Sequence, residues 1–168
     1  MAQMTAFSLL GLPEKFALTA DEVEAAWKKA IALVHPDRFA GRPAAERRVA
    51  EQWAGRINEA RDVLASDVGR ATELLKLRGV DIQTETDTRM DSAFLMQQMD
   101  WRERLETADE AGRVALASDV AAAKDAEKAV LTNALDESFD AEKARSAVRR
   151  LMFIEKMAAA VAGLRETL

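Results

Sequence analysis

Apolar residues recur at a helical spacing through most of this chain, and that spacing limits the folds open to it. Val23, Trp27, Ile31 and Val34 follow one another at intervals of 4, 4 and 3 residues, which places them on one face of an α-helix. A second stripe marks the next predicted helix, and its members are Val49, Trp53, Ile57, Ala60 and Leu64. Two amphipathic helices joined by a short loop predict an antiparallel hairpin.

Capping and helix-breaking residues set the bounds of the predicted helices. Thr19 followed by Glu22 matches a capping box, Pro36 disfavours helical geometry at His35, and Pro43 suits the first turn of the next helix. We expect helices over about residues 6–10, 19–35 and 67–77, besides the helix after Pro43, and a loop over residues 37–44. With three Pro, seven Gly and an abundance of strong helix formers, the fold class is all-α.

Charge divides the chain into two modules. Residues 1–78 hold 12 basic and 11 acidic side chains, a net charge of +1, whereas residues 79–168 hold 12 basic and 18 acidic, a net charge of −6. Residues 79–88 are polar and aperiodic, which predicts a linker. We expect three helices beyond it, over about residues 90–107, 108–135 and 139–165, and therefore a three-helix bundle over residues 89–168.

Composition excludes several classes of function. The chain has 168 residues, no Cys and one His, so it cannot form a disulfide, a cysteine zinc site, a directly ligated iron–sulfur cluster or a multi-histidine metal site. It has no run of about 18 apolar residues that could span a membrane. A net charge of −5 argues against nucleic-acid binding. We expect no cofactor, and a protein of the cytoplasm.

The tripeptide His35-Pro36-Asp37 stands between the two helices of the predicted hairpin. Each residue has a purely structural explanation: His suits a helix C-terminus, Pro commonly follows a helix, and Asp suits a turn. Its surroundings point further, because Lys28 lies within roughly 20° of His35 on the helical wheel and Lys29 flanks it on the side away from the core.

This arrangement resembles the J-domain of the DnaJ co-chaperones over about residues 4–77. Phe7-Ser-Leu-Leu-Gly-Leu12 before the hairpin and Ile57-Asn-Glu-Ala60 within it fit the same pattern. The resemblance implies that the tripeptide and the basic helix bind a DnaK-type chaperone and stimulate its ATPase, with no chemistry on this chain. The chaperone-binding residues that it implies are His35, Pro36, Asp37, Lys28, Lys29 and Arg38.

The first helix of the second module holds more apolar residues than one buried stripe can take. Phe94, Trp101 and Leu105 fall within about 20° of one another on the wheel and predict the buried face. A second face, apolar in part and edged with acid, contains Leu95, Met96, Met99, Asp100 and Glu103. Phe153 of the last helix also points away from its predicted core side. These residues either pack between neighbouring helices or form a docking surface.

The whole chain resembles the HscB family, which serves iron–sulfur cluster biogenesis. The residues that carry this resemblance are the J-domain motifs, Phe94-Leu-Met-Gln-Gln-Met and Arg149-Arg-Leu-Met-Phe153. It implies that the second module binds a scaffold protein of the IscU type and presents it to a DnaK/HscA-type chaperone. The scaffold-binding positions that match are Leu95, Met96, Met99, Asp100, Glu103 and Phe153. Met99 and Asp100 are conservative variants of the family's Leu and Glu, and Arg38 stands where Lys is common.

Three other functions compete with this interpretation. A general J-protein would deliver unfolded clients, but the chain has neither a Gly/Phe-rich linker nor a Cys-rich zinc module. An enzyme would use His35 as general base and Asp37 as its orienting group, yet no G-x-S-x-G motif, P-loop or second His accompanies them. A purely structural helical bundle is the third alternative, in which the tripeptide would only end a helix and form a turn. We expect an adaptor co-chaperone that is not an enzyme.

Overall fold

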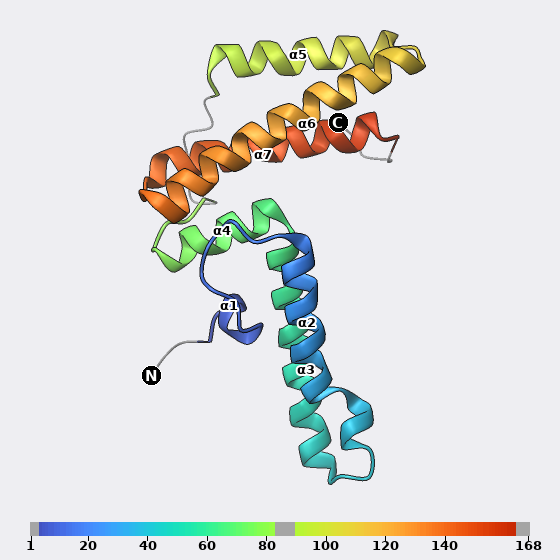
Figure 1. Cartoon of the computed structure of the whole chain (residues 1–168), viewed down its shortest axis with the longest axis vertical. Helices are drawn as coiled ribbons and strands as arrows, with labels where there is room; N and C mark the ends of the chain where they lie inside the picture. The colour runs from blue at the N-terminus through green and yellow to red at the C-terminus, as the bar shows by residue number, and fades with distance from the viewer. Residues whose placement is uncertain (1–3, 83–89, 164–168) are drawn as a thin grey trace. The chain divides into compact units, whose positions relative to one another are not determined.

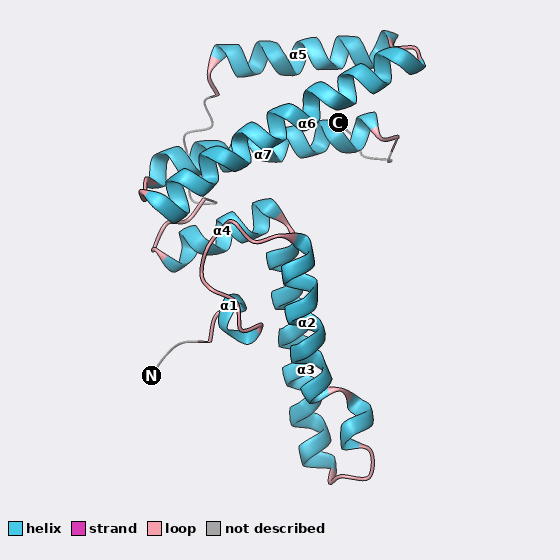
Figure 2. Ribbon diagram, viewed as in Figure 1, coloured by secondary structure: helices cyan, strands magenta, loops and turns pink. Residues whose placement is uncertain are grey.

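A computed structural model of the chain describes residues 4–82 and 90–163, which are helical with no strand among them. Contacts between Cα atoms divide the chain into two compact units, Met1–Arg78 and Gly79–Leu168, called unit 1 and unit 2 below. The all-α fold expected from the sequence is confirmed (Figure 2). Residues 83–88 of the predicted linker lie outside the described residues.

Unit 1 is built around a helical hairpin. Its elements are α1 (Ala6–Leu9), α2 (Ala20–Val34), the 3-10 helix η1 (Pro36–Phe39), α3 (Ala44–Ala65) and α4 (Asp67–Leu77). Figure 1 shows α2 and α3 side by side, with η1 in the connection at one end of the hairpin. The buried apolar side chains are Phe7, Leu10, Phe16, Leu18, Val23, Ala50, Ile57, Ala60, Leu64, Ala71, Leu74 and Leu75.

A buried arginine joins separate segments of unit 1 at the end of the hairpin away from η1. Arg70 is 3% exposed. Its guanidinium donates to the carbonyl oxygens of Phe16 at 2.6 Å and Leu64 at 2.8 Å, and to Asp67 Oδ1 at 2.7 Å. It also lies 4.6 Å from the centroid of the Phe16 ring. The Arg70 guanidinium therefore links the segment before α2 to the junction of α3 with α4. Asp67 pairs with its charge, and this offsets the free-energy cost of burying that charge.

Unit 2 is a bundle of three long helices, α5 (Ser92–Thr107), α6 (Glu110–Thr132) and α7 (Ala141–Val161). Each helix begins at an aspartate whose side chain accepts a backbone N–H three residues on, and these caps are Asp91, Asp109 and Asp140. The core cluster contains Phe94, Trp101, Leu116, Val120, Ile154, Met157 and Val161, with Leu105 packed against it. The predicted inward stripe of α5 is confirmed.

An ion pair joins α6 to α7 in unit 2. Arg150 Nε donates to Glu127 Oε2 at 2.8 Å, and both side chains are largely buried. This hydrogen bond raises the pKa of the Arg150 guanidinium, although burial acts in the opposite direction. Since arginine is charged at any physiological pH, the Arg150 guanidinium keeps its charge in this contact between the two helices.

Three details differ from the sequence-based expectations. Val49 was predicted in the buried stripe but is exposed, and Ala50 takes the buried position, because α3 turns that neighbouring residue toward the hairpin. Pro43 is the N-cap of α3 and not its first-turn residue. The predicted helix over 108–135 begins at Glu110 and ends as the π-helical turn η2 (Asn133–Glu137), where Ser138 N–H donates to the carbonyl of Asn133 at 2.9 Å.

We predict that Arg70→Met destabilises unit 1 strongly. Methionine keeps much of the length but removes every donor, so the Phe16 and Leu64 carbonyls and the Asp67 carboxylate lose the hydrogen bonds that Arg70 donates. The expected loss in free energy of unfolding is about 3 kcal/mol, measured by urea denaturation followed by circular dichroism. Arg42→Met is the control, because the pair of Arg42 with Glu46 is exposed and contributes less than about 1 kcal/mol. Equal losses for the two variants would contradict the role of Arg70.

Candidate functional site: two exposed surfaces

The sequence His35-Pro36-Asp37 forms the start of η1. His35 has extended backbone angles, φ −58° and ψ 137°, as its position before a proline favours. Its Nδ1 atom accepts the backbone N–H of Asp37 at 3.2 Å, and its carbonyl accepts the N–H of Arg38 at 2.9 Å. The histidine thus ends α2 and caps the following turn, while Pro36 starts that turn without leaving a backbone donor unpaired.

This cap determines what the tripeptide offers to solvent. Because Nδ1 of His35 accepts a hydrogen bond, the neutral imidazole carries its proton on Nε2. The imidazole is half exposed and the Asp37 carboxylate almost fully exposed. These three residues, His35 to Asp37, form the tip of the hairpin. The tip therefore presents one N–H donor and one carboxylate acceptor side by side. Asp37 Oδ2 lies 3.6 Å from Nδ1, too far to orient His35 as in a general-base dyad.

The predicted basic residues lie on the exposed side of the same helix. Lys28 and Lys29 of α2 are exposed, and so is Arg38 of η1, which donates to the carbonyl of Ala32 at 3.4 Å. On the other side of α2, contacts to α3 fix its orientation. Trp27 Nε1 donates to Asn58 Oδ1 at 2.9 Å, and Arg61 of α3 donates to Glu24 of α2 at 3.0 and 3.2 Å.

An apolar groove adjoins the tip. It measures about 430 Å³ and lies between the end of α2, η1 and the first turns of α3. Its lining residues are Val34, Phe39, Arg42, Ala45, Glu46, Val49, Ala50 and Trp53. The exposed position of Val49 belongs to this groove, which the sequence did not predict.

Unit 2 exposes the second predicted set of residues. Leu95, Met96 and Met99 of α5 and Phe153 of α7 are 49%, 69%, 65% and 45% exposed. Asp100 and Glu103 of α5 are exposed as well. We call these six residues the α5–α7 surface. These residues are not buried between neighbouring helices, so the purely structural alternative to a docking surface does not apply to them.

An aromatic pair connects the two helices of this surface. The rings of Phe94 and Phe153 meet edge to face, with centroids 6.2 Å apart and planes at 72°. Phe94 is buried, so its ring anchors Phe153 beside the turn of α5 from which Leu95 and Met96 project. Lys156 Nζ lies 5.7 Å from the centroid of the Phe153 ring. The contact brings residues nearly 60 positions apart in the sequence to one place.

The acidic edge of the surface contains one cation held by two carboxylates. Arg104 Nη1 donates to Asp119 Oδ2 of α6 at 2.8 Å and lies 3.9 Å from Asp100 Oδ2. With Glu103, which is also exposed on α5, the edge carries three carboxylates against this one paired guanidinium. It suits a partner with basic side chains around an apolar centre.

Met152 is an exposed neighbour of this surface that was not among the predicted site residues. It is exposed on α7 directly before Phe153. The signal was present, because Met152 belongs to the quoted segment Arg149-Arg-Leu-Met-Phe153 and lies 100° from buried Leu151 on the wheel. It widens the exposed apolar area of α7.

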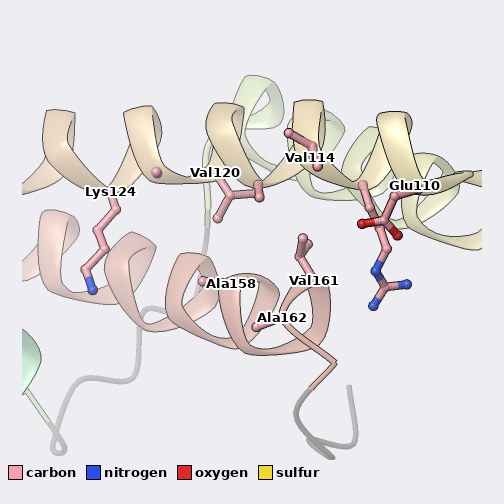
Figure 3. A pocket seen from close by; sticks show the side chains of 10 residues that line it. Glu110, Val114, Val120, Lys124, Ala158, Val161 and Ala162 are labelled. Carbon is pink, nitrogen blue, oxygen red and sulfur yellow. The ribbon is translucent and has the colours of Figure 1, made fainter.

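A groove of about 450 Å³ between α6 and α7 is unrelated to the predicted site residues, since none of them lines it. In Figure 3 the side chains of Glu110 and Lys124 mark its two ends, and Val120 and Val161 project between the helices. No three potential metal ligands cluster within residues 4–82 and 90–163. Across the same residues, no helix combines the length and hydropathy of a membrane span.

Known proteins resemble this chain along nearly its whole length. A protein of Bordetella avium named co-chaperone protein HscB homolog is 48% identical over 166 residues, which is 98% of this chain and 99% of that protein. The chain belongs to the HscB co-chaperone family. The homologue of the same name in Burkholderia thailandensis is 46% identical over 159 residues, or 92% of this chain and 90% of its own. The family resemblance inferred from the sequence is confirmed.

Solved HscB structures share the fold. Chaperone HscB from Vibrio cholerae superposes with a TM-score of 0.82 at 34% identity, over 95% of this chain and 96% of its own. Human co-chaperone HscB gives 0.86 at 26% identity, over 96% of this chain and 82% of its own. The family model described as the HSCB C-terminal oligomerisation domain matches residues 90–162, which fall in unit 2. This HscB-family protein is therefore a co-chaperone.

We predict that the exposed residues of α5 contribute little to stability. Leu95→Ala with Met96→Ala lowers the free energy of unfolding by less than about 1 kcal/mol, because little apolar area is lost from the core. Phe94→Ala is the matched control one position away. It removes a buried ring and costs about 3–5 kcal/mol. Urea denaturation measures both, and a comparable loss in the double variant would show that Leu95 and Met96 are core residues.

Proposed function

We propose that this HscB-family protein couples two binding events on one chain. Through the tip of unit 1 it binds a DnaK/HscA-type chaperone and stimulates its ATPase. Through the α5–α7 surface it binds an IscU-type iron–sulfur scaffold protein and delivers it to that chaperone. The observation that supports this most directly is the exposure of both residue sets, polar and basic in unit 1, apolar with an acidic edge in unit 2.

At the tip, order in the free protein favours tight binding. His35 already caps η1, and Pro36 begins that turn with a φ angle that its ring restricts. Little conformational entropy remains to be lost on docking. The imidazole Nε2–H would donate to an acceptor of the chaperone, and the Asp37 carboxylate would accept from a donor there. Lys28, Lys29 and Arg38 would speed encounter with an acidic face of the chaperone.

Stimulation of the ATPase requires no chemistry on this chain. The co-chaperone would shift the chaperone toward its hydrolysis-competent conformation, and it can do so only by binding that conformation more tightly. His35 and Asp37 supply a directional donor and acceptor, which distinguish two arrangements of a partner better than an apolar contact does. The lysines act at longer range and set the rate of association.

On the α5–α7 surface, apolar and charged residues would have different roles in binding. Leu95, Met96, Met99 and Phe153 supply the area that is removed from water. Asp100 and Glu103 at the edge would select a scaffold with basic side chains in register. Because both surfaces belong to one chain, a bound scaffold is held at high local concentration near the chaperone. Iron–sulfur protein maturation is the process that this delivery would serve.

We predict that His35→Gln abolishes stimulation of the chaperone ATPase. Glutamine removes the imidazole that caps η1 and presents the Nε2–H donor, so stimulation falls by more than about tenfold, equivalent to about 1.4 kcal/mol of lost coupling. Single-turnover ATP hydrolysis by the HscA-type chaperone measures the effect, and the circular dichroism spectrum stays unchanged. Lys76→Gln removes an exposed charge on α4 and is the control. Full stimulation by the His35 variant would contradict the role of the tip.

We predict that the triple change Leu95→Ala, Met96→Ala and Phe153→Ala weakens scaffold binding by about a hundredfold or more, since it truncates three side chains at the centre of the proposed interface. Titration calorimetry with the IscU-type scaffold measures the dissociation constant. Val114→Ala removes an equally exposed apolar side chain from α6, away from the α5–α7 surface, and leaves binding unchanged. Unchanged binding by the triple variant would disprove the assigned surface. Absence of scaffold binding by the wild type would favour a general J-domain co-chaperone.

A further inference from the structure

The methionines of this chain are distributed unevenly between surface and core. The sequence holds seven. Met96 and Met99 lie three residues apart on α5, so they are neighbours on one helix face, and they are 69% and 65% exposed. Met157 is 2% exposed in the core of unit 2. Met4 and Met152 are also exposed, and neither is one of the six residues of the α5–α7 surface.

Exposed thioethers are open to oxidation by peroxides. The sulfur lone pair attacks one peroxide oxygen, the O–O bond breaks, and that oxygen is transferred to sulfur. Methionine sulfoxide and, from hydrogen peroxide, one water molecule result. The sulfur loses two electrons and the peroxide gains them. Methionine sulfoxide reductases reverse the step at the expense of a dithiol.

We propose that Met96 and Met99 form a reversible oxidation site that switches scaffold docking off. This inference rests on the proposed function, because it gives the α5–α7 surface a regulated state. Both sulfur atoms lie where apolar contact with the scaffold is expected. A sulfoxide oxygen placed there must lose its water on docking, and an unpaired buried acceptor opposes binding.

The six residues of the α5–α7 surface offer the sulfoxide no side-chain hydrogen-bond donor. A sulfoxide oxygen is a hydrogen-bond acceptor. Asp100 and Glu103 next to it on α5 are also acceptors when ionised, and Leu95 has no polar atom in its side chain. The guanidinium of Arg104 is held between Asp119 and Asp100. Oxidation therefore adds acceptors to a face that already has an excess of them.

Oxidation at these positions leaves the fold intact. Neither side chain contributes to the core cluster of unit 2, so an added oxygen is accommodated in solvent. Met157 is protected by burial in the same unit, and its oxidation would report unfolding. The two outcomes, a changed surface and a damaged fold, are therefore separable in one sample.

The experiment treats the full-length co-chaperone with hydrogen peroxide, removes the peroxide with catalase, and then adds untreated IscU-type scaffold. Peptide mass spectrometry locates the sulfoxides, and calorimetry measures the dissociation constant. We expect sulfoxide at Met96 and Met99, none at Met157, an unchanged circular dichroism spectrum, and binding weakened by about tenfold or more. Treatment with methionine sulfoxide reductases restores the original dissociation constant.

Two variants assign the effect, each compared with its own untreated sample. In Met96→Leu with Met99→Leu, peroxide leaves the dissociation constant unchanged, because the oxidisable sulfurs are gone. In Met4→Leu with Met152→Leu, peroxide weakens binding as it does in the wild type. An equal loss in the first variant, or no loss in the wild type once both sulfoxides have formed, overturns the inference and leaves the proposed function standing. If the untreated wild type does not bind the scaffold, the proposed function itself fails.

Discussion

A helix that packs through a single stripe must leave its remaining surface to solvent, and both candidate surfaces follow from this constraint. In unit 1, α2 is held to α3 on one side by Trp27 and Glu24, so Lys28 and Lys29 face outward. In unit 2, α5 buries Phe94 and Trp101. A three-helix bundle has no fourth helix to cover the other face of α5, and apolar residues placed there stay exposed.

Two exposed side chains of these candidate surfaces are also partly held by the fold. Phe153 is exposed, yet its ring rests on buried Phe94. His35 is exposed, yet its Nδ1 atom is fixed by the backbone of Asp37. In each case one part of the side chain is held by the fold and the other part is free. Binding then costs less rotamer entropy than it would with a side chain free at every torsion.

Helical periodicity was sufficient to predict most of the fold, because a residue's place on the wheel follows from a fixed rotation per position. It placed Phe94, Trp101 and Leu105 inward, and it put Leu95, Met96 and Met99 on a second face without deciding whether a neighbouring helix covers that face. It was wrong for Val49, because the wheel shows which residues share a face but not where the covering element ends. It could not find Arg70, whose partner Phe16 lies 54 residues away. The roles proposed for His35 and Asp37 came from a family resemblance, since a cap and a binding tip look alike in one sequence.

Methionine in place of leucine at positions 96 and 99 of α5 has one favourable and one unfavourable consequence. An unbranched, polarisable thioether can adjust to an irregular partner surface, which leucine does less well. That adaptability is useful on an exposed face, because the free surface and the bound surface need not match in advance. The same sulfur carries the lone pair that peroxides oxidise, and exposure at Met96 and Met99 leaves it unshielded. Leucine at these positions would keep the apolar area and lose both properties, so adaptability and oxidation sensitivity are inseparable in this surface.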